Sequence, residues 1–242
     1  MAINVYAHVP NINDFTAGLK TALKPGEVIT LEFPHLLRLI KDTQFDTVYH
    51  EHFSCLSLYT VSRIFEQASL WVLAVERLPT HGGSLRVYGC HAGDSRPESP
   101  AVSVVLAEER RGGLQDLAVY RAFQPHANRV KNDLLLFLLE QKRAGRTVVA
   151  YGAAAKGNTL LNYAGVKPDL LPFVCDAAPS KQGRYLPGSH IPIVHPERIA
   201  AERPDYVLIL PWNLREEIRA ELDYVEAWGG QWVTAVPELN VF

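Results

Sequence analysis

The sequence predicts an α/β protein in which two Rossmann-like units follow one another along the chain. Near the N-terminus, an apolar strand, an amphipathic helix and a second apolar strand succeed each other within residues 3–33. The same order begins again at residue 147, where a strand runs through a turn of small residues into a helix. Alternation of strands and helices is typical of a doubly wound sheet, so we expect two such units in tandem.

The composition is that of an ordinary globular protein that binds small molecules. The chain has 242 residues, 48% of them hydrophobic, and a net charge of −2. Such a balance gives no electrostatic basis for binding nucleic acid or an anionic membrane surface. No segment approaches the roughly 20 apolar residues of a membrane span. Cys55, Cys90 and Cys175 are widely spaced and odd in number, so we expect free thiols, a cytoplasmic location and no metal site.

Apolar periodicity and turn residues predict the elements of the first unit. Asn and Asp at residues 11–14 begin a helix, and Lys24-Pro25-Gly26 ends it before the next strand. The predicted strands are 3–7, 28–33, 71–75 and 84–88, and the predicted helices after the first are 34–40 and 59–69.

A polar stretch separates the two units. Residues 91–101 contain Gly, Asp, Ser and two prolines, which is linker composition. Helices are predicted at 102–111 and 114–144, and Gly145 ends the second one. We therefore expect three parts: residues 1–92, a linker with long helices at 93–145, and a second domain at 146–242.

The turn that follows the strand 147–151 has the composition of an anion site. Gly152-Ala153-Ala154-Ala155-Lys156-Gly157 leads into a helix near Asn158. Small residues at a helix N-terminus let backbone N–H groups approach an anion, and Lys156 adds a positive charge. The turn is neither a P-loop nor a complete GxGxxG motif. Two interpretations stay open: a phosphate site, or small residues that only let the helix pack closely on the strand.

The rest of the second unit continues the alternation of strands and helices. A polar loop at 181–190 is rich in hydrogen-bond donors and lies beside the expected ligand edge. Pro192 cannot donate to a ladder, which favours an edge position for its strand. The predicted strands are 171–176, 191–194, 206–210 and 231–235, and the predicted helices are 196–201 and 214–228.

Titratable side chains are concentrated in the stretch 45–52, where Tyr49, His50, Glu51 and His52 are consecutive. We expect a loop beyond the end of a core strand, where His8 also lies. In an extended segment His50 and His52 would share one face. Three alternatives follow: an imidazole base oriented by a neighbour, two histidines that clamp a metal, or a polar loop with structural hydrogen bonds only. A metal needs three or four ligands, and no CxxC or HExxH motif accompanies the pair.

Five separated motifs carry a resemblance to a known family: FDTVYHEHFS, LPTHGGSLRVY, AYGAAAKGNTLLN, KQGRYLPGSHIPI and YVLILPWNL. Along essentially its whole length, the chain resembles the sugar C-methyltransferases, which use S-adenosylmethionine to methylate a carbon of a nucleotide-linked keto sugar. The resemblance implies the C-terminal part of a class I methyltransferase domain, which is Rossmann-like, followed by a second Rossmann-like domain that holds the sugar nucleotide.

The same resemblance implies parts that this sequence lacks. Family members have an N-terminal segment that binds zinc through cysteines, and a glycine-rich loop with an acidic partner that binds S-adenosylmethionine. Neither is found in the 242 residues. The chain is therefore expected to be a truncated member of the family, with zinc only in the missing N-terminal segment.

The resemblance also implies roles for the titratable stretch. By motif position, His52 is the base that removes a proton from the carbon next to the ketone. Tyr49 and Glu51 orient the sugar or stabilise the enolate, and His8 is a further hydrogen-bonding group. His50 is expected to be structural.

In the second unit, Lys156, Gly157 and Asn158 match a motif expected near the diphosphate. Additional contacts are implied for three residues of the polar loop: Lys181, Arg184 and Tyr185. Cys55 stands where relatives tend to carry an aromatic residue, so the lining of the pocket is expected to differ. His81 is expected to fix its Gly-Gly turn or the junction between the domains, rather than to take part in the chemistry.

The expected function is that of an S-adenosylmethionine-dependent C-methyltransferase. Its substrate would be a nucleotide-linked deoxysugar, most simply a dTDP-sugar, methylated at a carbon α to the ketone through an enolate. The alternative from another class is a catalytically inactive module that still binds the sugar nucleotide. A third hypothesis, an NAD(P)-linked enzyme, is disfavoured because the GxGxxG motif is missing.

Overall fold

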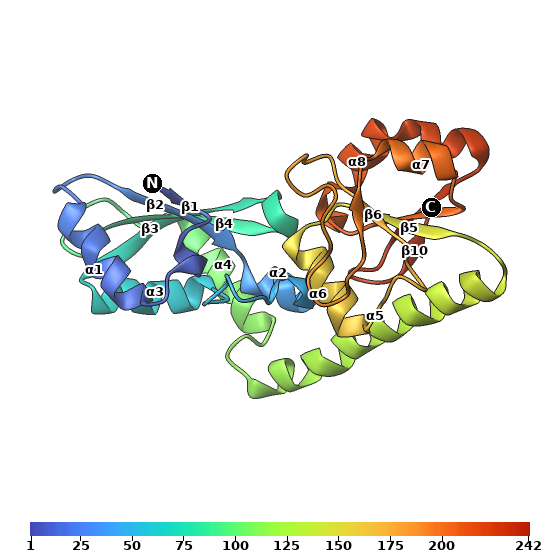
Figure 1. Cartoon of the computed structure of the whole chain (residues 1–242). Helices are drawn as coiled ribbons and strands as arrows, with labels where there is room; N and C mark the ends of the chain where they lie inside the picture. The colour runs from blue at the N-terminus through green and yellow to red at the C-terminus, as the bar shows by residue number, and fades with distance from the viewer. The chain divides into compact units, whose positions relative to one another are not determined.

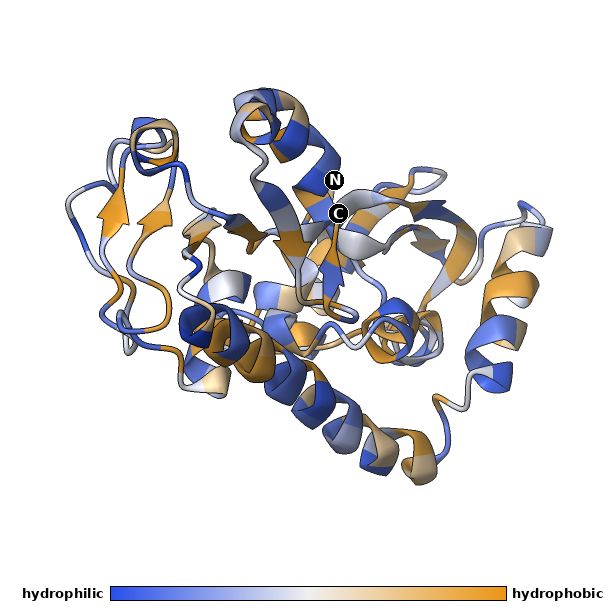
Figure 2. Cartoon of the chain, turned by 90° about the vertical axis from the view of Figure 1, so that its right-hand side faces the viewer, coloured by the Kyte–Doolittle hydropathy of each residue, from blue (hydrophilic) through white to orange (hydrophobic).

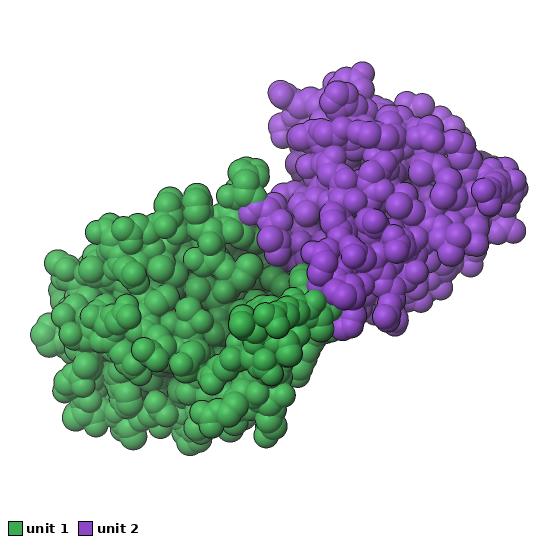
Figure 3. All heavy atoms as spheres, turned by 90° about the horizontal axis from the view of Figure 1, so that it is seen from below, with its two compact units in different colours: residues 1–41, 50–123 green, residues 42–49, 124–242 purple.

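The computed structural model describes residues 1–242 and shows two compact units, coloured separately in Figure 3. Unit 1 contains Met1–Lys41 and His50–Phe123, and unit 2 contains Asp42–Tyr49 and Gln124–Phe242. Each unit has its own sheet, so the predicted α/β class is confirmed (Figure 1). The segment Asp42–Tyr49 belongs to unit 2 although the residues on both sides of it belong to unit 1.

Unit 1 is built on a four-stranded sheet in the order β1-β2-β4-β3. β1 and β2 are parallel and are connected through α1, whereas β4 is antiparallel to both of its neighbours. The parallel pair with its helix is the predicted beginning of a doubly wound sheet. The bounds are β1 Ala2–Ile3, α1 Ile12–Ala22, β2 Ile29–Pro34, α2 Leu36–Lys41, α3 Leu58–Gln67, β3 Leu70–Leu78, η3 Thr80–Gly82 and β4 Ser84–His91.

The first strand is shorter than predicted. Only Ala2–Ile3 pair with β2, and Tyr6–His8 form a short 3-10 helix, η1. The reason is packing, because the fully buried Tyr6 lies against the rings of Phe15 and Phe33. Its hydroxyl is 2.7 Å from that of Thr16, and burial raises its pKa to about 12. The turn into the core ends the strand and brings His8 to the end of η1.

Helix α4, Pro100–Arg111, packs on β3 and completes the core of unit 1. Its Val102 and Val105 are buried in the same cluster as Leu31, Phe33 and Phe65. Each such side chain stabilises the fold by about 1.5–3 kcal/mol through burial. The compact unit therefore continues to Phe123, well beyond residue 92 where the sequence placed the end of the first domain.

Unit 2 is built on a six-stranded sheet in the order β10-β9-β8-β5-β6-β7. All its strands are parallel except β10, which is antiparallel to β9. The chain runs from β5 outward to the edge strand β7 and then returns to β8, on the other side of β5. β5 and β8 therefore flank a topological switch point, where ligands bind in open α/β sheets.

The elements of unit 2 agree with most of the predicted ones. The predicted helix 214–228 is in fact α8 followed by a 3-10 helix, η5. The bounds are η2 Phe45–Thr47, α5 Leu117–Arg143, β5 Val148–Tyr151, α6 Ala155–Ala164, β6 Val174–Cys175, β7 Ile193–Val194, α7 Glu197–Glu202, β8 Tyr206–Ile209, η4 Trp212–Leu214, α8 Arg215–Glu221, η5 Asp223–Trp228, β9 Gln231–Thr234 and β10 Asn240–Val241.

Burial explains the central strands and the long helix of unit 2. Every residue of β5 and β8 is buried, which is why both read as unbroken apolar runs. Helix α5, which includes the last residues of unit 1, carries hydrophilic and hydrophobic residues along its length (Figure 2). Gly145 follows it at φ +71°. None of the helices combines the length and apolar character needed to cross a bilayer.

Candidate functional site

After the short helix η2, the titratable stretch lies in a loop with a turn, so the predicted loop is confirmed and the stretch is not extended. Phe45–Thr47 are the 3-10 helix η2, and His50 and Glu51 lie in a turn. His50 is 88% exposed, and its Nε2 is 4.0 Å from Oε1 of the exposed Glu51. Successive side chains do not alternate between two faces in a turn. The structural role expected for His50 stays a prediction.

Unit 1 brings His52 together with His8. Their ring centroids are 4.7 Å apart with an interplanar angle of 70°, and both rings are partly exposed. The backbone N–H of Ser54 donates to the carbonyl of Ala7 at 3.2 Å, which ties the two segments beside the rings. Two imidazoles are too few for a metal clamp, and no group of three or more His, Cys, Asp or Glu is arranged to hold an ion. Proton transfer is the chemistry that this pair can support.

A buried carboxylate closes the stem of the loop that carries His52. His35 and Leu56 form an isolated β-bridge across the stem. Glu109 of α4, 1% exposed, accepts a hydrogen bond from Nε2 of His35 at 2.8 Å. It also accepts from the backbone N–H groups of Leu58 at 2.6 Å and Tyr59 at 2.9 Å, the first two residues of α3. One side chain thus fixes the stem and caps the following helix.

At the switch point of unit 2, two glycines allow α6 to pack closely on the end of β8. A Cβ at Gly157 would lie 2.7 Å from the Cβ of Leu210, and a Cβ at Gly152 would overlap Pro211. Gly152 also has φ +92°, which favours glycine. These contacts support the packing interpretation of the small residues. The N-terminus of α6 nevertheless carries no side-chain cap, so its first N–H groups lack a side-chain acceptor.

Four polar side chains meet at this point, and we call Lys156, Trp212, Asn213 and Asp46 the switch-point cluster. Lys156 Nζ donates to Oδ1 of Asn213 at 2.6 Å and lies 4.6 Å from the ring centroid of Trp212. The indole Nε1 of Trp212 donates to Oδ2 of Asp46 at 2.8 Å. Asp46 comes from η2, which packs against α6. The indole thus lies between a cation on its face and a carboxylate at its edge.

Burial perturbs both ionisable members of the switch-point cluster. Asp46 is 0% exposed, and its Oδ1 has no partner with hydrogen-bond geometry. Desolvation raises the pKa of Asp46 to about 6, although the Trp212 hydrogen bond, the Lys156 charge and the nearby backbone N–H groups lower it. Desolvation lowers the pKa of Lys156, and the Asp46 charge opposes that effect. Asp46 can therefore gain a proton only slightly below neutral pH.

The predicted residues of the polar loop are only partly connected to this region. Lys181 Nζ donates to Oδ2 of Asp176 at 2.9 Å, and the backbone N–H of Ala153 donates to the same oxygen at 2.7 Å. Asp176 thus ties Lys181 to the turn before α6. Arg184 and Tyr185 are exposed on the loop, Tyr185 by 65%. Both are available to a ligand, but the structure gives them no contact with the cluster.

Asp46, Trp212 and Asn213 were not predicted as site residues from the sequence. Trp212 and Asn213 lie a few residues beyond the end of the buried strand β8, so the rule that ligands bind at the carboxyl ends of strands could have indicated them. Asp46 lies in the titratable stretch, but nothing in the sequence links it to Trp212, because the two residues are 166 positions apart. The Nε2 of His81 is 2.9 Å from Nδ2 of Asn4, and the role expected for His81 stays a prediction.

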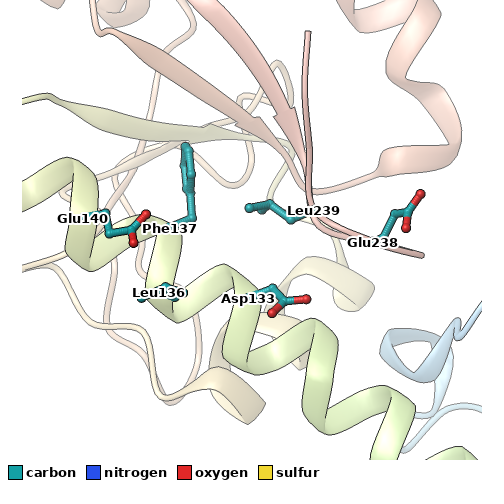
Figure 4. Close-up of a pocket in the computed structure, with 6 residues that line it drawn as sticks. All are labelled: Asp133, Leu136, Phe137, Glu140, Glu238 and Leu239. Carbon is teal, nitrogen blue, oxygen red and sulfur yellow. The ribbon is translucent and has the colours of Figure 1, made fainter.

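A separate pocket of about 350 Å³ lies in unit 2 and contains none of the predicted site residues. It is formed by α5 and the segment between β9 and β10 (Figure 4), and its lining is Asp133, Leu136, Phe137, Glu140, Glu238 and Leu239. Three of these six residues are acidic, so the pocket is unsuited to a phosphate-bearing ligand.

The residues of unit 1 do not form a cradle for S-adenosylmethionine. The connection from β1 to α1, residues 4–11, contains no glycine, and the connection from β2 to α2 is the single residue His35. A nucleotide cofactor of this type needs a turn in which backbone N–H groups can approach closely. No residue of unit 1 is therefore assigned to the cofactor.

Comparison with known proteins gives two matches. A family model described as "C-methyltransferase C-terminal domain" matches residues 79–237. The chain is also 38% identical over 237 residues to the C-methyltransferase NovU of Streptomyces niveus. That alignment covers 98% of the chain but 56% of NovU, so the chain spans little more than half the length of this relative.

Proposed function

The chain belongs to the C-methyltransferase family, and on that premise we propose that it methylates a carbon next to the ketone of a nucleotide-linked deoxysugar. The observation that carries the proposal is the imidazole pair of unit 1, in which His8 lies 4.7 Å from His52. A carbon acid beside a ketone has to lose a proton before it can attack a methyl group. Imidazole is the side chain best suited to that step at neutral pH.

The step assigned to this chain is the removal of the proton. A ring nitrogen of His52 accepts the proton from the carbon, and the electron pair of the broken C–H bond forms the enolate. Tyr49 and Glu51 orient the sugar or stabilise the enolate oxygen, and His8 supplies a further hydrogen bond. S-adenosylmethionine, the general methyl donor of methyltransferases, would provide the methyl group.

Unit 2 is proposed to hold the nucleotide. Lys156, Gly157 and Asn158, at the uncapped N-terminus of α6, bind the diphosphate, with further contacts from Lys181, Arg184 and Tyr185. The support is the position of this helix end at the switch point of a parallel sheet together with a cation. A dTDP-sugar is the expected ligand.

Deuterium exchange tests the proton step without the methyl donor. A dTDP-linked keto-deoxysugar incubated with the protein in D₂O should take up deuterium at the carbon next to the ketone, followed by mass spectrometry. Replacing a general base typically costs about 10²–10⁴-fold in rate. His52→Asn should therefore slow the exchange by that factor. The matched control is His50→Asn, which changes an exposed imidazole two residues away and should exchange at the normal rate.

The experiment also separates the enzyme from an inactive binding module. If the dTDP-sugar binds to the unchanged protein but takes up deuterium no faster than in buffer alone, the protein is better described as an inactive binding module. If His52→Asn exchanges as fast as the unchanged protein, the assignment of the base is wrong.

A further inference from the structure

A phosphate-bearing ligand bound at Lys156 brings its negative charge close to the carboxylate of Asp46. Lys156 is the cation that offsets the charge of this carboxylate. Asp46 is completely buried, and one of its oxygens has no well-aligned partner. Its other oxygen accepts from Trp212, whose ring face carries Lys156. An arriving anion engages the same ammonium that compensates Asp46.

The surroundings of Asp46 contain few other charges. From α6, the group that acts on Asp46 electrostatically is Lys156. From η4, Trp212 donates a hydrogen bond and Asn213 is neutral. Tyr163 of α6 packs on Phe45 rather than on Asp46, with ring centroids 5.2 Å apart. The charge balance of the switch-point cluster therefore depends on one cation and one carboxylate.

We propose that a nucleotide diphosphate ligand bound at Lys156 is accompanied by uptake of a proton on Asp46. The inference rests on the proposed nucleotide-binding role of unit 2 and adds a residue and a linkage to it. When the diphosphate draws the charge of Lys156, the ionised form of Asp46 loses its compensation and is repelled by the ligand. The protonated carboxyl removes this repulsion while Trp212 still donates to it.

The expected size of the linkage follows from the pKa of about 6 in the free protein. Asp46 is then about one-tenth protonated at pH 7. Binding should take up close to one proton per ligand between pH 7 and pH 8, and the association constant should fall up to about tenfold per pH unit in that range. Affinity thus rises as the pH falls toward 6.

Titration calorimetry with dTDP-glucose in buffers of different ionisation enthalpy measures the number of protons taken up. Each phosphate of this probe carries one ester and one anhydride bond and has a single strongly acidic hydroxyl, so the diphosphate does not titrate near neutral pH. Asp46→Asn keeps an oxygen that accepts from Trp212, but its side chain cannot titrate. The number of protons that this variant takes up on binding should therefore fall to near zero. The matched control is Asp169→Asn, an exposed carboxylate of unit 2 that should keep the normal uptake.

Trp212→Phe provides a second variant in case the first one folds poorly. It removes the N–H that lowers the pKa of Asp46 and keeps a ring beside Lys156. Proton uptake on binding of dTDP-glucose should persist. The pH at which half a proton is taken up should be higher than in the unchanged protein. If dTDP-glucose binds without uptake, or if Asp46→Asn takes up as many protons as the unchanged protein, the linkage is refuted while nucleotide binding stands. If dTDP-glucose does not bind at all, the nucleotide role of unit 2 fails as well.

Discussion

At the scale of single residues, Asp46 is a buried carboxylate that weakens the folded state when it ionises. Its pKa is raised from 3.8 to about 6 by burial. In the unfolded chain the group ionises at its usual pKa, so the folded state binds the proton more tightly. The stability that this proton confers is fully present below pH 3.8 and is lost as the pH rises through 6.

Asp46→Asn should therefore change how stability depends on pH. The raised pKa corresponds to about 3 kcal/mol between pH 4 and pH 7, which is an upper value for the effect. Relative to the unchanged protein, the variant should gain stability over this range, because its amide carries no charge at any pH. Denaturant unfolding at both pH values, followed by tryptophan fluorescence, measures the difference. Parallel stability curves for the two proteins would show that Asp46 keeps its usual pKa.

At the scale of elements, Glu109 shows how one helix can hold another. Its carboxylate accepts from the first two N–H groups of α3 and from His35, and it is 1% exposed. A buried charge with three donors around it is costly to disturb, because the donors are left without a partner.

Glu109→Gln should destabilise unit 1 by about 3–5 kcal/mol. The amide NH₂ group would face donors that now face an oxygen. The neighbouring Glu108→Gln is the matched control, since Glu108 makes a surface pair with Arg77 that is worth about 0–1 kcal/mol. Chemical denaturation of both variants gives the comparison. Equal losses in the two variants would mean that Glu109 is not what holds the stem of the loop.

The elements also show what could be predicted from the sequence. β5 and β8 were predicted because buried parallel strands are unbroken apolar runs. The strand at 3–7 was predicted too long because its apolar pattern does not reveal that Tyr6 packs on Phe15 and Phe33. Of the four residues in the switch-point cluster, only Lys156 was predicted from the sequence. Lys156 has a local signature, whereas its partners come from η2 and η4 and are joined only by the tertiary fold.

At the scale of the whole molecule, unit 2 is discontinuous, because it includes a short segment from the first third of the chain. Asp42–Tyr49 contribute Phe45, which packs on Tyr163, and Asp46, which accepts from Trp212. A fragment of residues 124–242 would expose the surface under Phe45 and leave the Trp212 N–H without this acceptor.

Such a fragment should be less stable than the same unit in the intact chain by about 3–5 kcal/mol, from the lost burial of one aromatic side chain and one buried hydrogen bond. Its unfolding midpoint in urea, followed by the fluorescence of its tryptophans, measures the loss. The matched control is a polypeptide in which a flexible Gly/Ser linker joins residues 42–49 to the fragment, and it should recover most of the stability. Equal midpoints with and without residues 42–49 would contradict the structural role of the segment.

The distance of 166 positions between Asp46 and Trp212 also has a consequence for how the protein is made. Ribosomes add about 5–20 residues per second, so Asp46 is synthesised about 8–33 s before its partner exists. Until Tyr163 has been made, the nascent chain presents Phe45 without the ring that packs on it. The segment is thus exposed to chaperones and proteases during translation, and its hydrogen bond to unit 2 forms only after Trp212 has been synthesised.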